Sequence, residues 1–172
     1  MYMNILLTGE PHVGKSTLMQ NLVQGIERKQ GFLTREIIDN GIRTGYELVS
    51  ALGDTATLAS VHSKSKVRVS RYGVNVEALE TFVAKLPPAE PGNLLYIDEI
   101  GQMELFSTNF KSLALSYLDA SEPFIATLKK DYHDDFTDAL RARNDTEIIE
   151  VTRQNRDTLG PELASRIVTQ LD

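Results

Sequence analysis

Short apolar runs and amphipathic stripes alternate along the chain. The first run, Asn4–Thr8, is continuous and is typical of a buried strand, and a glycine-containing loop begins after it at Gly9. Apolar residues then recur at helical spacing, at Leu18, Met19, Leu22, Val23 and Ile26. The pattern predicts a strand–loop–helix unit at the amino end.

An antiparallel hairpin is predicted next. The stretch Phe32–Ile38 is followed by Asn40-Gly41, a pair that readily adopts the positive φ values of a tight turn. Alternation resumes after the turn, at Ile42, Thr44, Tyr46 and Leu48. From Gly53 to Gly73 the pattern weakens into short strand-like pieces.

The rest of the chain alternates helices and strands. The predicted elements are a helix over Val76–Leu86 with Asn75 as N-cap and a stop at Pro87-Pro88, a strand over Leu94–Ile97, a helix from Ser107 to Leu118, a strand over Phe124–Leu128, a helix with Asp131, Asp134 and Asp135 early and Arg141 and Arg143 late, a strand over Ile148–Val151, and a closing helix with Pro161 in its first turn. Such alternation predicts an α/β fold in three layers, with a mostly parallel sheet and a β-hairpin insertion after the first helix.

Composition narrows the class of protein. With 172 residues and 41% hydrophobic residues, the chain is long enough for one core, and we expect a single domain over residues 1–172. A net charge of −6 argues against a DNA-binding protein and makes RNA binding improbable. The absence of cysteine fits a reducing, cytoplasmic location, and no apolar run is long enough for a membrane span. We expect a monomer.

A phosphate-binding loop lies between the first strand and the first helix. Residues 9–16 fit G-x-x-x-x-G-K-[ST], whose glycines let backbone N–H groups point at phosphate oxygens. Lys15 is expected to bridge the β- and γ-phosphates as a catalytic residue, and the Ser16 hydroxyl to bind Mg²⁺. The predicted nucleotide-binding residues here are Gly9, Glu10, Pro11, His12, Val13, Gly14, Lys15, Ser16 and Thr17.

Two carboxylates follow the apolar strand at Leu94–Ile97. This is how a Walker B strand brings a metal-binding acid to the carboxyl edge of a sheet, so Asp98 is the predicted second ligand of Mg²⁺. Glu99 is predicted to orient and deprotonate the attacking water. The segment also fits the D-x-x-G pattern of a GTPase switch, but no Asn-Lys-x-Asp follows to read guanine, which disfavours a dedicated GTPase.

The motifs together resemble a known family, the small P-loop nucleoside triphosphatases first described from thermophiles and also called cancer-related NTPases. The likeness runs along nearly the whole chain and rests on the phosphate loop with Thr17-Leu18, Gly31-Phe32-x-Thr34-x-Glu36, Gly41-x-Arg43-x-Gly45-Tyr46, Tyr72-Gly73-Val74, Asp98-Glu99-Ile100-Gly101-x-Met103-Glu104-Leu105 with Phe110, and Val151-Thr152-x-x-Asn155-Arg156. The chain departs from the family pattern at His12, Ser16, Gln102 and Arg71, where glycine, threonine, proline and lysine are usual.

The resemblance implies a RecA-like sheet in which an added strand separates the phosphate-loop strand from the Walker B strand. It also implies a slow hydrolase that accepts several nucleoside triphosphates. By the same resemblance Arg153 and Asn155, after the last strand, would lie beside the base.

Three readings of function stay open at this point. The first is a magnesium-dependent nucleoside triphosphatase, the second a kinase that transfers the γ-phosphoryl group to a small acceptor, and the third a nucleotide-loaded switch that contacts a partner. The predicted role of Glu99 in positioning a water molecule favours the triphosphatase. The basic stretch Lys64, Lys66, Arg68 and Arg71 could supply an arginine finger, but we expect it to be solvated, and the dispersed His12, His62 and His133 indicate no metal site.

Overall fold

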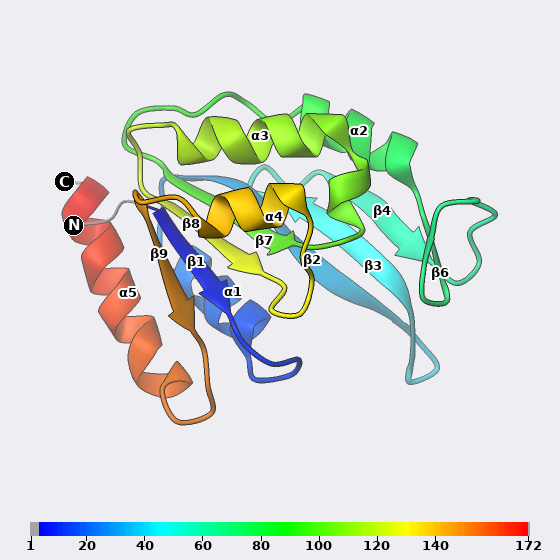
Figure 1. Ribbon diagram of the computed structural model, residues 1–172, viewed down its shortest axis with the longest axis horizontal. Helices are drawn as coiled ribbons and strands as arrows, with labels where there is room; N and C mark the ends of the chain where they lie inside the picture. The colour runs from blue at the N-terminus through cyan, green and yellow to red at the C-terminus, as the bar shows by residue number, and fades with distance from the viewer. Residues whose placement is uncertain (1–3, 172) are drawn as a thin grey trace.

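One twisted sheet organises the whole fold (Figure 1). The computed structural model describes residues 4–171, and over these the sheet has nine strands in the order β5-β6-β4-β3-β2-β7-β8-β1-β9. The strands are β1 Asn4–Thr8, β2 Lys29–Asp39, β3 Ile42–Ser50, β4 Thr55–Ser60, β5 Arg68–Val69, β6 Tyr72–Val74, β7 Leu94–Ile100, β8 Phe124–Leu128 and β9 Thr146–Glu150. The helices are α1 Lys15–Gln24, α2 Val76–Ala84, the 3-10 turn η1 Glu104–Phe106, α3 Thr108–Leu118, α4 Asp135–Arg141 and α5 Arg156–Leu171.

The parallel part of the sheet contains the strands that carry the predicted motifs. Strand β8 pairs in parallel with both β1 and β7, so it separates the phosphate-loop strand from the strand that bears Asp98. This confirms the added strand implied by the family resemblance. Because the carboxyl ends of parallel strands meet at one edge of a sheet, the loops that follow β1, β7 and β8 lie close together.

The antiparallel part of the sheet is larger than a single hairpin insertion. Strands β2 and β3 pair antiparallel around Asn40 (φ 49°) and Gly41 (φ 78°), which confirms the predicted turn. The ladder then continues antiparallel through β4, β6 and β5. The sheet is therefore mixed, and the expectation of a mostly parallel sheet is corrected. Strands as short as β5 and β6 leave too few residues for an alternating pattern to appear in the sequence.

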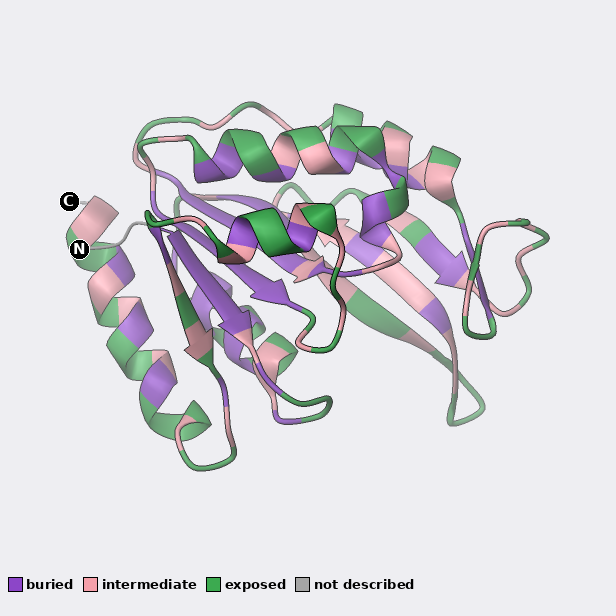
Figure 2. Ribbon diagram, in the orientation of Figure 1, coloured by how far each residue is buried: buried purple, intermediate pink, exposed green. Residues whose placement is uncertain are grey.

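Helices cover both faces of the sheet. Helices α1 and α5 pack on one face around Met19, Leu22 and Leu163, and α2 and α3 pack on the other around Phe82 and Phe110. Figure 2 shows buried residues running along the central strands and the sheet-facing sides of the helices. The three-layer arrangement is as predicted. No helix among residues 4–171 is long and apolar enough to cross a bilayer.

Two of the predicted boundaries are wrong. Strand β7 continues to Ile100, so Asp98 and Glu99 lie inside the strand rather than after it. Helix α5 begins at Arg156, which places Pro161 within the helix instead of in its first turn. The start is set earlier, because the Asn155 amide oxygen accepts from the Thr152 N–H (2.8 Å) and the Thr152 hydroxyl accepts from the Asn155 N–H (3.3 Å).

The charges predicted for helix α4 are also partly displaced. Arg141 lies in the last turn of this helix, but Arg143 follows its C-cap and pairs with Asp119 and Asp145. Asp131 precedes the helix, whose N-cap is Asp134.

Candidate functional site

The phosphate loop leaves β1 in a conformation that only glycine tolerates at its first residue. Gly9 has φ 146°, and a Cβ atom there would lie 2.4 Å from the Val151 carbonyl oxygen. The loop ends at Gly14 (φ 107°), which caps α1. The sequence spacing of the two glycines thus matches the two points where the backbone bends into left-handed conformations.

His12 occupies a left-handed position within this loop. Its φ is 64°, a conformation that costs a side-chain-bearing residue about 1–2 kcal/mol relative to the right-handed region. This accounts physically for the preference for glycine at this position in the family pattern. The loop keeps the conformation with histidine present, and the His12 side chain is exposed on the cavity wall.

The amino end of α1 is open to an anion. No side chain caps this helix, and its first turn contains no acidic residue. The N–H groups of the first turn have no partner within a helix, so their partial positive charge is available to a ligand. Ser16 and Thr17 lie in this turn and are exposed. The helix end and the loop together form the kind of cradle that binds phosphate groups.

The Lys15 ammonium group folds over the loop. It donates hydrogen bonds to the carbonyl oxygens of Gly9 and Glu10, each at 2.8 Å. Burial lowers the pKa of Lys15, while the nearby carboxylates of Glu99 and Asp98 act in the opposite direction. Those two hydrogen bonds hold the ammonium group at the entrance of the cradle.

Asp98 lies opposite the loop and is fully enclosed, with 1% of its surface exposed. Its Oδ1 atom accepts hydrogen bonds from Ser16 Oγ (3.2 Å) and Thr127 Oγ1 (2.6 Å), and Thr34 Oγ1 donates to its main-chain oxygen. Burial raises the pKa of Asp98, and the hydroxyls of Thr127 and Ser16 oppose that rise by bonding the charged form. The predicted pair Ser16 and Asp98 is therefore brought together, although the residues lie far apart in the sequence.

The site contains a second buried acid, to which the sequence-based prediction assigned no role. Glu104 in η1 is only 4% exposed and lines the same cavity as Glu99. Burial, followed by the charge of Glu99, raises the pKa of Glu104 to about 8, and burial followed by Asp98 raises the pKa of Glu99. The two carboxyls flank Gly101, where a Cβ would lie 2.7 Å from Glu99 Oε1 and 3.1 Å from Glu104 Oε2. The sequence feature that could have indicated this acid is its position between two apolar residues, Met103 and Leu105.

These groups line one cavity of about 690 Å³. One wall is the phosphate loop, the floor is Asp98 and Glu99, and the far wall comes from the antiparallel strands β2 and β3. The residues of the far wall include Thr34, Glu36, Arg43 and Tyr46. Arg43 is held there by Glu36 (2.6 Å) and by the Tyr72 hydroxyl (3.1 Å). The cavity is large enough for a polyphosphate chain and further groups.

The loop after β8 forms the remaining side of the cavity. Lys129, Lys130 and Asp131 all line it, and the sequence reading assigned no role to the two lysines. The Lys130 ammonium group pairs with Glu10 (2.7 Å) and Glu150 (2.8 Å). The Glu10 carboxylate therefore points toward Lys130 of this loop. The bond that Lys15 makes to Glu10 goes to the main-chain carbonyl oxygen.

The predicted base-side residues lie beyond the cavity. Arg153 is exposed, and the Asn155 side chain is engaged in the cap of α5 and donates to the Glu150 carbonyl (2.9 Å). Neither lines the cavity of the phosphate loop. Arg156 is nearer, since its Nη1 donates to the Val13 carbonyl of the loop (3.1 Å).

An uncapped helix end behind a glycine loop, faced by a buried aspartate on a strand two positions away in the sheet, defines a P-loop nucleotide-binding protein. The model of the family described as NTPase matches residues 4–164, and the chain belongs to this family.

Relatives and solved structures agree with this family. The chain is 40% identical to nucleoside-triphosphatase THEP1 of Natranaerobius thermophilus, covering 98% of each chain, and 36% identical to that of Thermotoga maritima, covering 95% of this chain and 94% of the other. The crystal structure of THEP1 from Aquifex aeolicus superposes with a TM-score of 0.86 at 31% identity, covering 95% of this chain and 98% of the other. The solution structure of a human cancer-related nucleoside triphosphatase superposes with a TM-score of 0.77 at 27% identity, covering 95% and 96%.

Proposed function

We propose that this nucleoside-triphosphatase splits the bond between the β- and γ-phosphates of a magnesium-bound nucleoside triphosphate by attack of water, slowly and with broad base specificity. The observation that carries the proposal is the juxtaposition of the phosphate loop with Asp98 and Glu99 across one cavity, with Ser16 Oγ and Asp98 Oδ1 3.2 Å apart. The family to which the chain belongs supports hydrolysis over the kinase and switch readings.

The oxygen atoms of Ser16 and Asp98 fit a magnesium ion. Mg²⁺ prefers oxygen ligands and is usually held by one or two protein groups together with substrate phosphates and water. Thr127 fixes the orientation of the Asp98 carboxylate. Among residues 4–171, no three His, Asp or Glu side chains are grouped so that they could hold a metal ion by themselves. When bound, the ion supplies positive charge to the β- and γ-phosphate oxygens.

Lys15 and Glu99 then have separate roles. Lys15 exchanges its bonds to the Gly9 and Glu10 carbonyls for bonds to β- and γ-phosphate oxygens. Glu99, beside Asp98 on β7, orients a water molecule toward the γ-phosphorus and accepts its proton. Its raised pKa, caused by burial and by Asp98, makes it a stronger proton acceptor than an ordinary carboxylate.

The first test is Lys15→Ala. We expect it to abolish binding of a nucleoside triphosphate in a calorimetric titration, because the phosphate loop loses its only ammonium contact to the β- and γ-phosphates. Lys85→Ala, at the exposed C-cap of α2, is the matched control and should bind as the parent does. Unchanged affinity in Lys15→Ala would refute the binding site.

The second test is Glu99→Gln. We expect retained nucleotide affinity and a turnover at least about tenfold slower, since removal of a positioned base costs about 10²–10⁴ in rate. Free phosphate is measured with magnesium and ATP, GTP, CTP or UTP, with and without small acceptors. Normal turnover in the variant would remove Glu99 from the mechanism, and acceptor-dependent release of diphosphate would favour the kinase.

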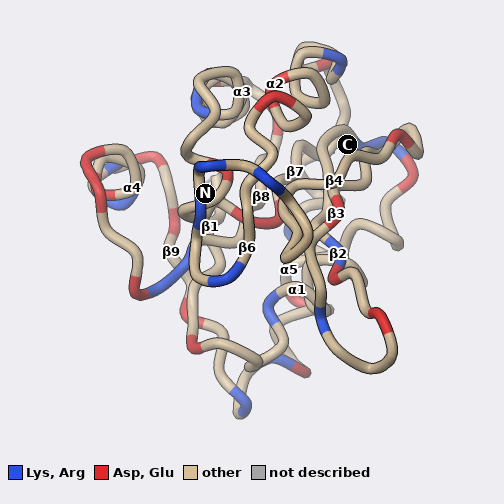
Figure 3. Tube along the Cα trace, turned by 90° about the vertical axis from the view of Figure 1, so that its right-hand side faces the viewer, with Lys and Arg blue, Asp and Glu red and all other residues tan. Residues whose placement is uncertain are grey.

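Several finer expectations remain predictions. These are the contacts of Arg153 and Asn155 with the base, the single domain over residues 1–172, the cytoplasmic location, the monomeric state and the absence of DNA and RNA partners. The interspersed acidic and basic positions along the trace support the last of these (Figure 3).

A further inference from the structure

The transition state of phosphoryl transfer needs positive charge beyond Lys15 and the metal. Charge spreads over the three equatorial oxygens of the γ-phosphoryl group, and many enzymes of this kind add an arginine to meet it. The basic stretch weighed from the sequence does not line the cavity: Arg71 donates to the Arg43 carbonyl (2.6 Å), and Arg68 to the Arg71 carbonyl (2.5 Å). Arg43 does line it, but its charge is paired with Glu36.

Lys129 is placed between the two halves of the site. It directly follows β8, the strand that lies between β1 with the phosphate loop and β7 with Asp98 and Glu99. Its N–H donates to the Ile100 carbonyl of β7 (3.3 Å), which ties the start of this loop to the Walker B strand. The side chain lines the cavity together with Lys15 and Glu99.

The ammonium group of Lys129 differs from those of its neighbours. Lys15 donates to two loop carbonyls, and Lys130 is paired with Glu10 and Glu150. Among residues 4–171, no group lies within hydrogen-bond or ion-pair distance of Lys129 Nζ. Its charge nevertheless reaches Glu99, because Lys129 acts to lower the pKa of that carboxyl against the effects of burial and Asp98.

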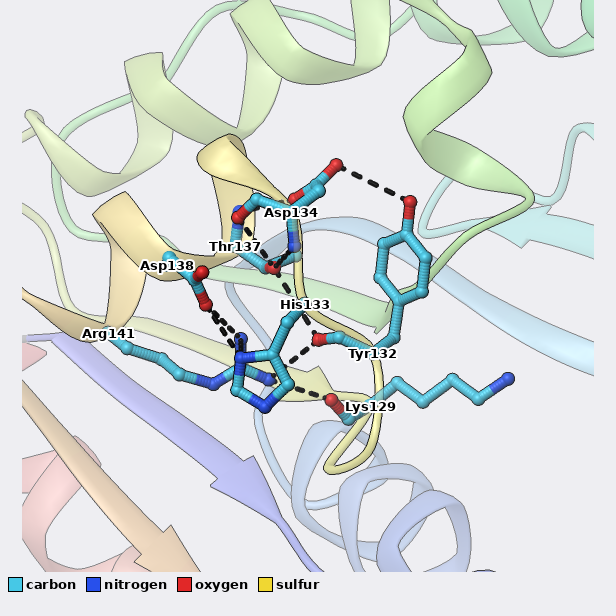
Figure 4. A network of polar contacts seen from close by, with 7 residues as sticks. All are labelled: Lys129, Tyr132, His133, Asp134, Thr137, Asp138 and Arg141. Atoms are coloured by element: carbon cyan, nitrogen blue, oxygen red, sulfur yellow. Dashed lines mark hydrogen bonds and ion pairs between the residues drawn. The ribbon is translucent and has the colours of Figure 1, made fainter.

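The backbone at Lys129 is held although its side chain is not. Arg141 of α4 donates through Nη2 to the carbonyl oxygens of Lys129 (2.9 Å) and Tyr132 (3.1 Å). The helix start is itself fixed, because Asp134 and Thr137 form a reciprocal capping box. Figure 4 shows this network, with the Lys129 side chain extending away from it. The main chain of Lys129 is fixed, while its ammonium group remains available to bind an anionic ligand.

We propose that Lys129 is a catalytic residue that supplies, from within the same chain, the cation that binds the γ-phosphoryl group as it is transferred to water. This rests on the proposed function. The water oxygen bonds to the γ-phosphorus while its proton passes to Glu99. The bond from the γ-phosphorus to the bridging oxygen breaks, and its electron pair stays on the β-phosphate. Lys129 keeps all its protons and donates hydrogen bonds to the equatorial oxygens of the γ-phosphoryl group.

The test compares Lys129→Met with Lys129→Arg and with Lys111→Met, a control on α3 whose ammonium group lies 5.8 Å from the Phe136 ring. We expect single-turnover hydrolysis by Lys129→Met to fall at least about thirtyfold, with the dissociation constant for the triphosphate within about threefold of the parent. Lys129→Arg should recover most of the rate, and Lys111→Met should match the parent.

A second measurement reads the transition state without turnover. Calorimetry compares the affinity for ADP–Mg²⁺ with and without aluminium fluoride, a mimic of the transferring phosphoryl group. Aluminium fluoride should tighten the binding of ADP–Mg²⁺ by the parent. In Lys129→Met this tightening should be at least tenfold smaller, while the affinity for ADP–Mg²⁺ alone is unchanged. Parent-like rate and parent-like gain in Lys129→Met would overturn the proposal, as would an equal loss of ADP binding. A parent that hydrolyses nothing would instead count against the proposed function.

Discussion

Three carboxyl groups that line the cavity have different surroundings. Asp98 accepts hydrogen bonds from two hydroxyls, which compensate its burial in part. Glu104 faces Glu99 across Gly101, so burial and like charge together raise its pKa from the ordinary 4.5 to about 8. At neutral pH Glu104 is therefore mostly protonated, which reduces repulsion against Glu99. The neutral acid lets a second carboxylate remain charged in a buried site.

This protonation predicts a pH-dependent stability. Below pH 4.5 Glu104 is protonated in both the folded and the unfolded chain, whereas between pH 4.5 and 8 only the unfolded chain releases the proton. The folded protein thus loses stability as pH rises through this range, on the order of 4 kcal/mol from this group. Glu104→Gln removes the titration. The free energy of unfolding is measured in urea at pH 5 and pH 8. Relative to the parent, the variant should be more stable at pH 8 than at pH 5.

The control for that measurement is Glu162→Gln, an exposed position on α5. It is expected to follow the parent at both pH values. A constant difference between Glu104→Gln and the parent at pH 5 and pH 8 would mean that Glu104 is already ionised in the folded protein.

At the scale of elements, the joint between the parallel and antiparallel parts of the sheet depends on Gly31. Strand β2 pairs in parallel with β7 at this point, with Gly31 opposite Tyr96. A Cβ at Gly31 would lie 1.8 Å from the Tyr96 carbonyl oxygen, and φ is 137°. Backbone atoms do not yield as a side chain does, so the glycine is required for the two strands to approach.

Gly31→Ala is therefore expected to destabilise the fold by at least about 3 kcal/mol, because strand β2 must separate from β7 to accommodate the new atom. Gly41→Ala is the matched control. It also has positive φ (78°) but no atom within 4 Å of the added Cβ, so about 1 kcal/mol is expected. Thermal and urea unfolding compare the two. Equal losses in both variants would show that backbone conformation, and not close approach, sets the requirement at Gly31.

Helix α4 is expected to act on turnover through the loop that it holds. Arg141→Ala removes both hydrogen bonds to the carbonyls of Lys129 and Tyr132, so that loop loses its anchor. We expect turnover to fall about three- to tenfold with little change in nucleotide affinity. Arg143→Ala is the control, since its partners Asp119 and Asp145 lie outside the cavity. An unchanged rate in Arg141→Ala would mean that the loop keeps its position without the arginine.

Elements with long periodic patterns were predictable from the sequence, and those set by tertiary contacts were not. The phosphate loop and the strand of Asp98 follow from local pattern, because glycine spacing and an apolar run are read directly from the sequence. Strands β5 and β6 are too short to show a period, and the start of α5 depends on the reciprocal bonds of Thr152 and Asn155. Glu104 and Lys129 join the site only because η1 and β8 bring them there.

At the scale of the whole molecule, the site is assembled from segments that lie far apart in the sequence and that the sheet brings together. Its walls come from β1 with the start of α1, from β2 and β3, from β7 and from the loop after β8. Each wall belongs to a different part of the chain, so a ligand that contacts all of them links the parallel and antiparallel parts of the sheet. Binding energy at the site is therefore available to stabilise the fold as a unit.

This predicts a thermal shift that requires both nucleotide and metal. At a concentration of a non-hydrolysable triphosphate 100 times its dissociation constant, ligand binding adds about 2.7 kcal/mol, which for a domain of this size raises Tm by about 5–10 °C. In the proposed function Ser16 and Asp98 act through the ion, so chelation of magnesium should reduce the shift by more than about half. Asp98→Asn keeps the shape of the side chain but weakens the metal ligand, and it should behave with magnesium as the parent does with chelator. A full shift in chelator would separate nucleotide binding from the metal, and the assignment of Ser16 and Asp98 as its ligands would then be wrong.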